Sequence, residues 1–147
     1  MFYTYEFEVF ESNGLLIATP YDMDGGTQGE DWEDLGEMVP DWLRGEINYR
    51  LMKGLELPVH TFGNSPRKGG TNIMVSVQAG LDTVERVTAA DAARMLGVTP
   101  GRVSQMLSTG QLIGWRDGHS SYVTRESVEA RLKNEAKAGR PRAGASA

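Results

Sequence analysis

One short segment of the chain holds two sets of helix start and stop signals in close succession. Thr88 precedes an alanine-rich run that ends at Gly97, and Thr99-Pro100 precedes a second run that ends at Gly110. Threonine is a favoured N-cap, proline is favoured at the first helical position, and glycine adopts the left-handed conformation that ends helices. The segment therefore predicts two short helices joined by a tight turn.

A hairpin and a third helix are expected to follow. Residues 112–116 and 119–123 have the character of strands, and the Asp-Gly pair between them is preferred in two-residue hairpin turns. Thr124 then caps another helix. The order of helix, turn, helix, two-stranded wing and helix predicts a winged helix-turn-helix domain over residues 86–135, a fold that binds DNA.

The second helix of this domain is the candidate reader of DNA. Its apolar residues, Val103, Met106 and Leu107, would be buried, which leaves other residues near its N-terminus facing outward. This part of a recognition helix reaches base edges in the major groove. The residues expected to read bases are Arg102, Ser104 and Gln105, and those expected to hold the DNA backbone are Arg94, Thr99, Arg116 and His119. For the histidine, an exposed loop position without a ligand is an equal alternative.

The same segment resembles the excisionase and MerR-like helix-turn-helix family. The resemblance covers about a third of the chain and implies DNA binding. A small helical domain that makes only protein contacts is the alternative, since a fold does not determine a function. The matching residues are Ala92, Ala93, Leu96, Gly97, Val98, Thr99, Pro100, Gly110, Leu112, Tyr122, Thr124, Glu126 and Val128.

Charge is divided unevenly along the chain. Residues 81–147 hold ten Lys and Arg against seven Asp and Glu, a net charge of +3, whereas residues 1–80 hold five against thirteen, a net charge of −8. A positive excess is expected where a domain contacts phosphates. Because +3 is small, one such unit should bind DNA weakly, and we expect a homodimer or higher homo-oligomer. The division also favours two small domains over one.

Residues 1–80 predict an α+β domain. Alternation of apolar and polar residues indicates strands, and an apolar stripe that includes Trp32 and Leu35 indicates a helix. Pro40 interrupts the stripe, so we expect a kink or two abutting helical segments. The order β-β-β-α-β predicts a sheet with a helix packed on one face. The expected strands are 2–10, 15–19, 24–29 and 72–77, and the expected helix is 31–53.

These N-terminal residues resemble the HicB antitoxin family. The resemblance is carried by Pro20, by the helix-opening run 27–34, by the loop at Pro58 and by the strand at Ile73. It implies a truncated ribonuclease H-like domain ahead of a DNA-binding domain. It also implies a type II antitoxin that neutralises a small basic, mRNA-cleaving toxin of the HicA family and represses its own operator. Residues 21–26 depart from the family pattern.

Acidic residues gather at the start of the predicted helix and form the candidate surface for such a toxin. Complementary charge would steer a basic partner to them, although a solvated helix face is an equal alternative. A stand-alone transcriptional regulator with an N-terminal dimerisation or sensing domain is the alternative function. The candidate partner-binding residues are Glu30, Asp31, Glu33, Asp34, Glu37 and Asp41.

Several functions are not expected. The chain has no cysteine and only two histidines, well apart, so we expect neither a metal site nor a cofactor. A ribonuclease H-like fold suggests two-metal catalysis, which needs carboxylates that converge on one site. Most of the acids lie in one helix-opening run, so we expect no enzyme. No stretch has the length and hydropathy of a membrane span or leader, which predicts a cytoplasmic protein. Residues 136–147 are expected to form a disordered basic tail.

Overall fold

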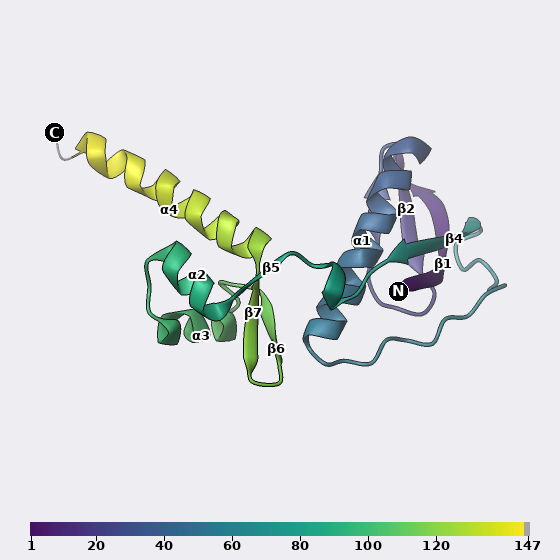
Figure 1. The fold of residues 1–147 in the computed structure, drawn as a ribbon. Helices are drawn as coiled ribbons and strands as arrows, with labels where there is room; N and C mark the ends of the chain where they lie inside the picture. Colours follow the sequence, from purple (N-terminus) through teal and green to yellow (C-terminus); the bar gives the residue numbers. More distant parts are fainter. Residues whose placement is uncertain (146–147) are drawn as a thin grey trace. The chain divides into compact units, whose positions relative to one another are not determined.

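A computed structural model describes residues 1–145, and residues 146–147 lie outside the described part. The chain divides into two compact units, Met1–Thr83 and Val84–Ala147, which we call the N-terminal unit and the C-terminal unit. Each unit combines helices with one antiparallel sheet (Figure 1). The mixed α+β class expected from the sequence is confirmed.

The N-terminal unit is built on a four-stranded antiparallel sheet of order β3-β2-β1-β4. The alternation in the first strand is confirmed, because Tyr5, Phe7 and Val9 are all buried in the core. Asn13 and Gly14 close the first hairpin with positive φ angles of 51° and 78°, as a tight two-residue turn requires. The strands are β1 (Phe2–Ser12), β2 (Leu15–Pro20), β3 (Thr27–Gly29) and β4 (Thr71–Gln78).

One face of this sheet is covered by helix α1 (Trp32–Met52; Figure 1). The buried residues of α1 recur at every fourth position, so they form one stripe that packs on the core face of β1 and β4. The stripe consists of Leu35, Val39, Leu43 and Ile47. The predicted sheet with a helix on one side is therefore present.

Three details of this unit differ from the prediction. Trp32 is 53% exposed, because the buried stripe of α1 begins only at Leu35. Helix α1 is continuous through Pro40 and is not split into two segments. The missing N–H of Pro40 removes only the hydrogen bond to the carbonyl of Gly36, an exposed residue whose carbonyl water can reach. Strand β3 is shorter than expected, since Gly25 before it has a φ of 97° and is not extended.

In the C-terminal unit three helices pack around a second core. They are α2 (Ala89–Leu96), α3 (Pro100–Thr109) and α4 (Arg125–Ala145). The predicted caps are present, because the hydroxyls of Thr88 and Thr99 accept from backbone N–H groups at the starts of α2 and α3. The buried residues of this core are Ala92, Ala93, Leu96, Val103, Met106, Leu112, Val123 and Val128.

The sheet of the C-terminal unit has three strands, where the sequence predicted two. Its order is β5-β7-β6, and all neighbours are antiparallel. The additional strand is β5 (Arg86–Thr88), which lies directly before the first predicted helix of this unit. Three residues are too few to show an alternating pattern, so only pairing with β7 reveals the strand. The other strands are β6 (Gly114–Asp117) and β7 (Ser120–Thr124).

The turn of the β6–β7 hairpin is displaced by one residue from the prediction. Asp117 pairs with Ser120, so the two turn residues are Gly118 and His119. Gly118 has a φ of 60° and occupies the first turn position, which is where glycine is required in one of the two favoured hairpin turns. His119 therefore lies at the tip of the hairpin.

The chain after residue 135 also differs from the prediction of a disordered tail. Helix α4 continues to Ala145. Ala136 and Lys137 are strong helix formers that follow directly on established helical turns, so extension of the helix is locally favourable. The last part of the predicted tail, residues 146–147, lies outside the described residues. Over residues 1–145, none of the helices has the combination of length and hydropathy that a membrane span requires.

Candidate functional site

Helix α3 of the C-terminal unit has a capped start, a glycine at its end and one buried side. Gly97 ends α2 in the left-handed conformation with a φ of 66°, and Thr99 then caps α3, with Pro100 at its first position. Gly110 ends α3 with a φ of 79°. Val103 and Met106 are buried against the unit's core, so the rotation of α3 about its axis is determined. The opposite side of the helix is left facing solvent.

The three residues predicted to read bases lie on or beside this solvent side. Ser104 and Gln105 are exposed, and Arg102 is half-buried. The guanidinium of Arg102 donates from Nη1 to Gln105 Oε1 at 2.8 Å and from Nη2 to Gln111 Oε1 at 3.4 Å. Arg102 is therefore held in one orientation near the N-terminal end of α3 by two side-chain amides.

The four residues predicted to contact the DNA backbone are all exposed, but three are already engaged within the unit. Arg94 forms an ion pair with Asp91 on α2. The hydroxyl oxygen of Thr99 accepts from the backbone N–H of Arg102 as the cap of α3. Arg116 donates from Nε to the carbonyl of Gly118 at 3.3 Å, which holds it along the hairpin turn. His119 extends from the hairpin tip.

The hairpin packs directly on α3. A Cβ atom at Gly114 in β6 would lie 3.0 Å from Leu107 Cδ2 and 2.0 Å from the carbonyl oxygen of Tyr122, so only glycine allows this approach. Tyr122 also stacks obliquely on Trp115, with ring centroids 5.8 Å apart. Helix α3 and the start of the hairpin are therefore in contact, and their exposed side chains form one surface.

Two features of this surface were not predicted from the sequence. Gln111 orients Arg102 although it lies nine residues further along the chain, beyond the end of α3. Arg86 on β5 places its guanidinium 5.8 Å from the ring centroid of Trp115 and 5.0 Å from that of Tyr122. Such cation–π contacts depend on the pairing of β5 with β7, so the sequence around Arg86 gives no sign of them.

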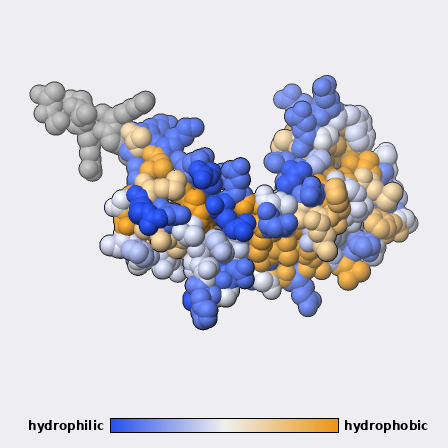
Figure 2. All heavy atoms as spheres, viewed as in Figure 1, coloured by the Kyte–Doolittle hydropathy of each residue, from blue (hydrophilic) through white to orange (hydrophobic). Residues whose placement is uncertain are grey.

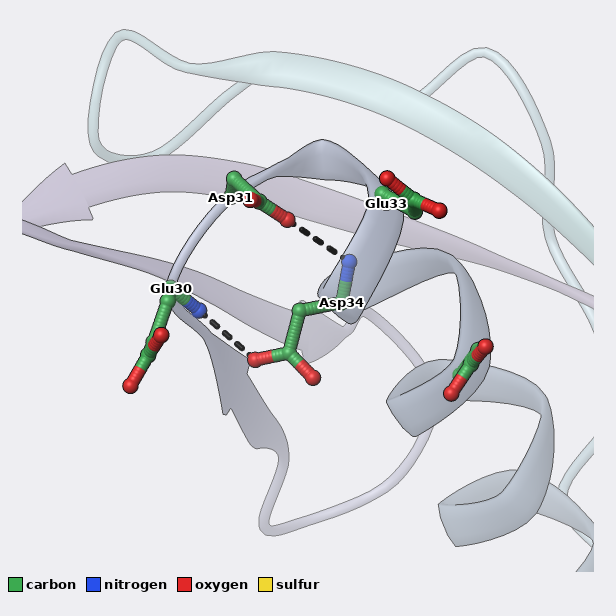
Figure 3. A pocket seen from close by; sticks show the side chains of 5 residues that line it. Glu30, Asp31, Glu33 and Asp34 are labelled. Atoms are coloured by element: carbon green, nitrogen blue, oxygen red, sulfur yellow. Dashed lines mark hydrogen bonds between the residues drawn. The ribbon is translucent and has the colours of Figure 1, made fainter.

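The acidic residues of the N-terminal unit gather around the first turn of α1 (Figure 3). Asp31 Oδ1 accepts from the backbone N–H of Asp34 at 2.8 Å, and Asp34 Oδ2 accepts from the backbone N–H of Glu30 at 2.8 Å. These two aspartates therefore cap the helix. The carboxylates of Glu30 and Glu33 point to opposite sides in Figure 3 and form no hydrogen bond drawn there.

A shallow cavity of about 330 Å³ lies at this helix start. Five of the six predicted partner-binding residues line it, and Asp41, which is exposed further along α1, does not. The lining residues are Glu30, Asp31, Glu33, Asp34 and Glu37. The glutamates and Asp41 are the acids of this set that have no capping role in α1.

A second group of acids was missed. Glu6 and Glu8 lie on the face of β1 opposite α1, where alternation predicts exposure, yet they are only 6% and 2% exposed. Both carboxylates accept from backbone N–H groups of the loop before β4. Glu6 accepts from Gly63 and Asn64, and Glu8 accepts from three loop residues, Arg67, Lys68 and Gly70.

These hydrogen bonds change the acidity of both glutamates. The backbone and side-chain N–H groups of Asn64 hold the pKa of Glu6 below its ordinary value, against the effect of burial. Burial by itself would raise the pKa of Glu8, but the three loop N–H groups and the charge of Arg67 outweigh it, so this pKa is also lowered. Both groups are therefore structural carboxylates that fasten the loop to the sheet.

The N-terminal unit should lose stability in acid because of these two residues. Their folded pKa values lie below that of an unfolded glutamate, about 4.3. Their stabilisation is therefore complete above that pH and is lost as the pH falls through the folded values. Thermal unfolding followed between neutral pH and acid should show this loss, and Glu6→Gln and Glu8→Gln should flatten it. Glu126→Gln, in the other unit, serves as the control. An unchanged pH profile in both variants would contradict the assignment.

Over residues 1–145, no three histidine, aspartate or glutamate side chains converge as a metal-binding group. Comparison of the chain with protein-family models, with curated proteins and with solved structures found no match.

Proposed function

We propose that the protein is a DNA-binding repressor of the antitoxin type. Its C-terminal unit acts as a winged helix-turn-helix domain, with α3 as the recognition helix and the β6–β7 hairpin as the wing. The observation that carries this proposal is the N-terminal end of α3, where exposed Ser104 and Gln105 flank an Arg102 that two amides hold in place. A pre-oriented guanidinium with polar neighbours suits the base edges of the major groove.

The charge of the C-terminal half supports contact with phosphates. Residues 81–147 carry a net charge of +3, and the exposed cations Arg94 and Arg116 lie on α2 and on the hairpin. Phosphate contacts of this kind position a protein on the duplex, and base contacts provide the sequence preference. Because each unit contributes few cations, we propose that two copies bind together as a homodimer, on two half-sites of an operator.

We propose that the N-terminal unit is the antitoxin half, a truncated ribonuclease H-like domain that binds a small basic ribonuclease similar to the HicA toxins. Its net charge of −8 over residues 1–80 favours a basic, RNA-binding partner. The carboxylates of Glu33 and Glu37 are exposed, lie one helical turn apart and are not used to cap α1. They are placed to mimic RNA phosphates toward the toxin.

The partner can be identified by purifying the tagged full chain from its native host and eluting bound proteins with high salt. The proposal predicts a small basic protein that cleaves RNA when alone and stops when the chain is added back. The double variant Glu33→Lys with Glu37→Lys should lose this inhibition because it reverses the charge of the proposed contact. The matched control, Glu126→Lys with Glu129→Lys on α4, makes the same change in charge and should keep it.

The result separates the two halves of the proposal. If no ribonuclease is recovered and the full chain still binds DNA selectively, the antitoxin role is excluded and the protein is a stand-alone transcriptional regulator. If the ribonuclease is recovered but both double variants inhibit it equally well, the toxin binds elsewhere than at the start of α1.

A further inference from the structure

Strand β4 forms an open edge of the N-terminal sheet. In the order β3-β2-β1-β4 it has a neighbour on one side only. Its sequence, TNIMVSVQ, contains neither a charged residue nor a proline over eight residues. Proteins usually protect a long edge strand with charge, proline or a bulge, because its unpaired backbone groups can pair with another chain. Strand β4 carries neither charge nor proline.

The backbone groups that face this edge can be identified from the pairing of β1. The N–H of Tyr21 donates to the carbonyl of Glu6, so the backbone of Glu6 faces β2. The backbone N–H and C=O groups of successive strand residues point toward opposite neighbouring strands. Those of Tyr5 therefore point toward β4, where Tyr5 pairs with Val75. The residues on either side of Val75 must then direct their N–H and C=O groups away from β1. These outward groups belong to Asn72, Met74 and Ser76.

Apolar side chains surround the same edge on the face of the sheet opposite α1. Met74 is 67% exposed and Phe2 is 72% exposed. A cavity of about 440 Å³ lies beside them, and hydrophobic surface is visible on the N-terminal unit in Figure 2. Exposed apolar residues that are grouped together indicate a contact surface. The residues that line the cavity are Phe2, Tyr3, Thr4, Tyr5, His60, Phe62 and Met74.

We propose that β4 pairs antiparallel with β4 of a second copy of this chain, about a two-fold axis that passes beside Met74. In this register Met74 lies opposite its own counterpart, and Asn72 lies opposite Ser76 of the other copy in both directions. Each of these three pairs exchanges two backbone hydrogen bonds, so the contact gains six. The two sheets become one continuous sheet, and both Met74 side chains meet on its face opposite α1.

Charge favours a second copy over a basic partner at this edge. Strand β4 is uncharged, so pairing two copies buries no like charges, whereas a basic protein would gain nothing from contact with it. The acids of the N-terminal unit are concentrated at the start of α1. That end of α1 packs on β3, where a Cβ atom at Gly29 would lie 2.6 Å from the backbone nitrogen of Leu35. The acidic clusters of the two copies therefore lie at the far edges of the joined sheet.

This inference rests on the proposed function in one respect only, which is the purpose of the dimer. Pairing of the two N-terminal units would join the two C-terminal units that are proposed to bind the half-sites of an operator. The pairing itself requires neither DNA nor a toxin. Its test can therefore fail or succeed separately from the tests of DNA and toxin binding.

The experiment introduces a positive or a negative charge at Met74 in the full chain, and sedimentation equilibrium measures the molar mass. The wild type should be a dimer. Met74→Lys and Met74→Glu should each raise its dissociation constant at least about tenfold, because like charges then meet across the axis. An equimolar mixture of the two variants should restore the dimer. Met38→Lys, an exposed methionine on α1, is the matched control and should leave the dimer unchanged.

Amide hydrogen exchange supplies the readout specific to the edge strand. In the wild-type dimer the amides of Asn72, Met74 and Ser76 should be protected, and the protection should fall on dilution. A monomeric wild type, a dimer whose three amides exchange rapidly, or a mixture that fails to reassociate would each overturn the proposal. If the wild-type dimer has protected edge amides but binds no DNA, the proposed function is refuted and this pairing remains in place.

Discussion

Replacing Arg102 with alanine should weaken operator binding about tenfold or more and relax the preference for one base pair. A bidentate arginine contact to a guanine contributes roughly 1–3 kcal/mol of discrimination. Arg102 is suited to that contact because Gln105 and Gln111 hold its guanidinium in place before DNA arrives, so little side-chain entropy is lost on binding. Fluorescence anisotropy on the selected operator, and on variants with one base pair changed, measures both effects.

Two further variants separate base reading from simple loss of charge. Arg44→Ala removes one positive charge from the N-terminal unit and should change the affinity little. Arg102→Lys keeps the charge but lacks the planar fork, so it should recover part of the affinity without the base preference. If Arg102→Ala has the same affinity and the same base preference as the wild type, Arg102 is not a reader.

Replacing Leu112 with alanine should abolish DNA binding by unfolding the C-terminal unit. The side chain of Leu112 is buried in the core between α3 and the hairpin. Truncation of a buried leucine costs about 2–5 kcal/mol, which is a large part of the stability of a small domain. The N-terminal unit has its own core and should remain folded. Thermal unfolding followed by circular dichroism should therefore show an early transition that the wild type lacks.

The neighbouring residue provides the control for this variant. Ile113 is 54% exposed, so Ile113→Ala removes a similar apolar side chain at little cost and should retain both folding and DNA binding. A transition in Leu112→Ala at the temperature at which the wild-type N-terminal unit unfolds would show that the two units fold separately. If Leu112→Ala unfolds at the wild-type temperature, the described core of the C-terminal unit is wrong.

The parts of the fold that could be predicted are those specified by local chemistry. Thr88 and Thr99 cap helices with hydroxyls that reach N–H groups three residues away, and Gly97 and Gly110 end them by their backbone freedom. The alternation of β1 is local in the same sense. Residues close in the sequence therefore determine whether a segment is a helix or a strand. Most of the predicted boundaries agree with the observed ones within a few residues.

The parts that could not be predicted depend on residues far apart in the sequence. Glu6 and Glu8 appear in the sequence as the polar face of β1, but they bind loop residues 57 to 62 positions away. Strand β5 is likewise defined by its partner β7, through pairs such as Val87 with Val123. No periodicity within either segment indicates these contacts.

The candidate DNA site shows the same division. The outward direction of Ser104 and Gln105 follows from the burial of the apolar residues beside them in α3, and periodicity is enough to predict it. The orientation of Arg102 depends on Gln111, whose position is determined by the chain path after α3 ends. The exposure of Ser104 and Gln105 was therefore predictable, whereas the contacts that orient Arg102 were not.

The most direct test of DNA reading by α3 is selection from a library of random DNA duplexes by the full wild-type chain and, in parallel, by Arg102→Ala. If α3 reads bases through Arg102, the wild type should enrich one motif with two symmetric half-sites, and the variant should lose the preference at one position of each half-site. Enrichment of no motif, or of the same motif with the same preference by both proteins, would contradict DNA reading by α3.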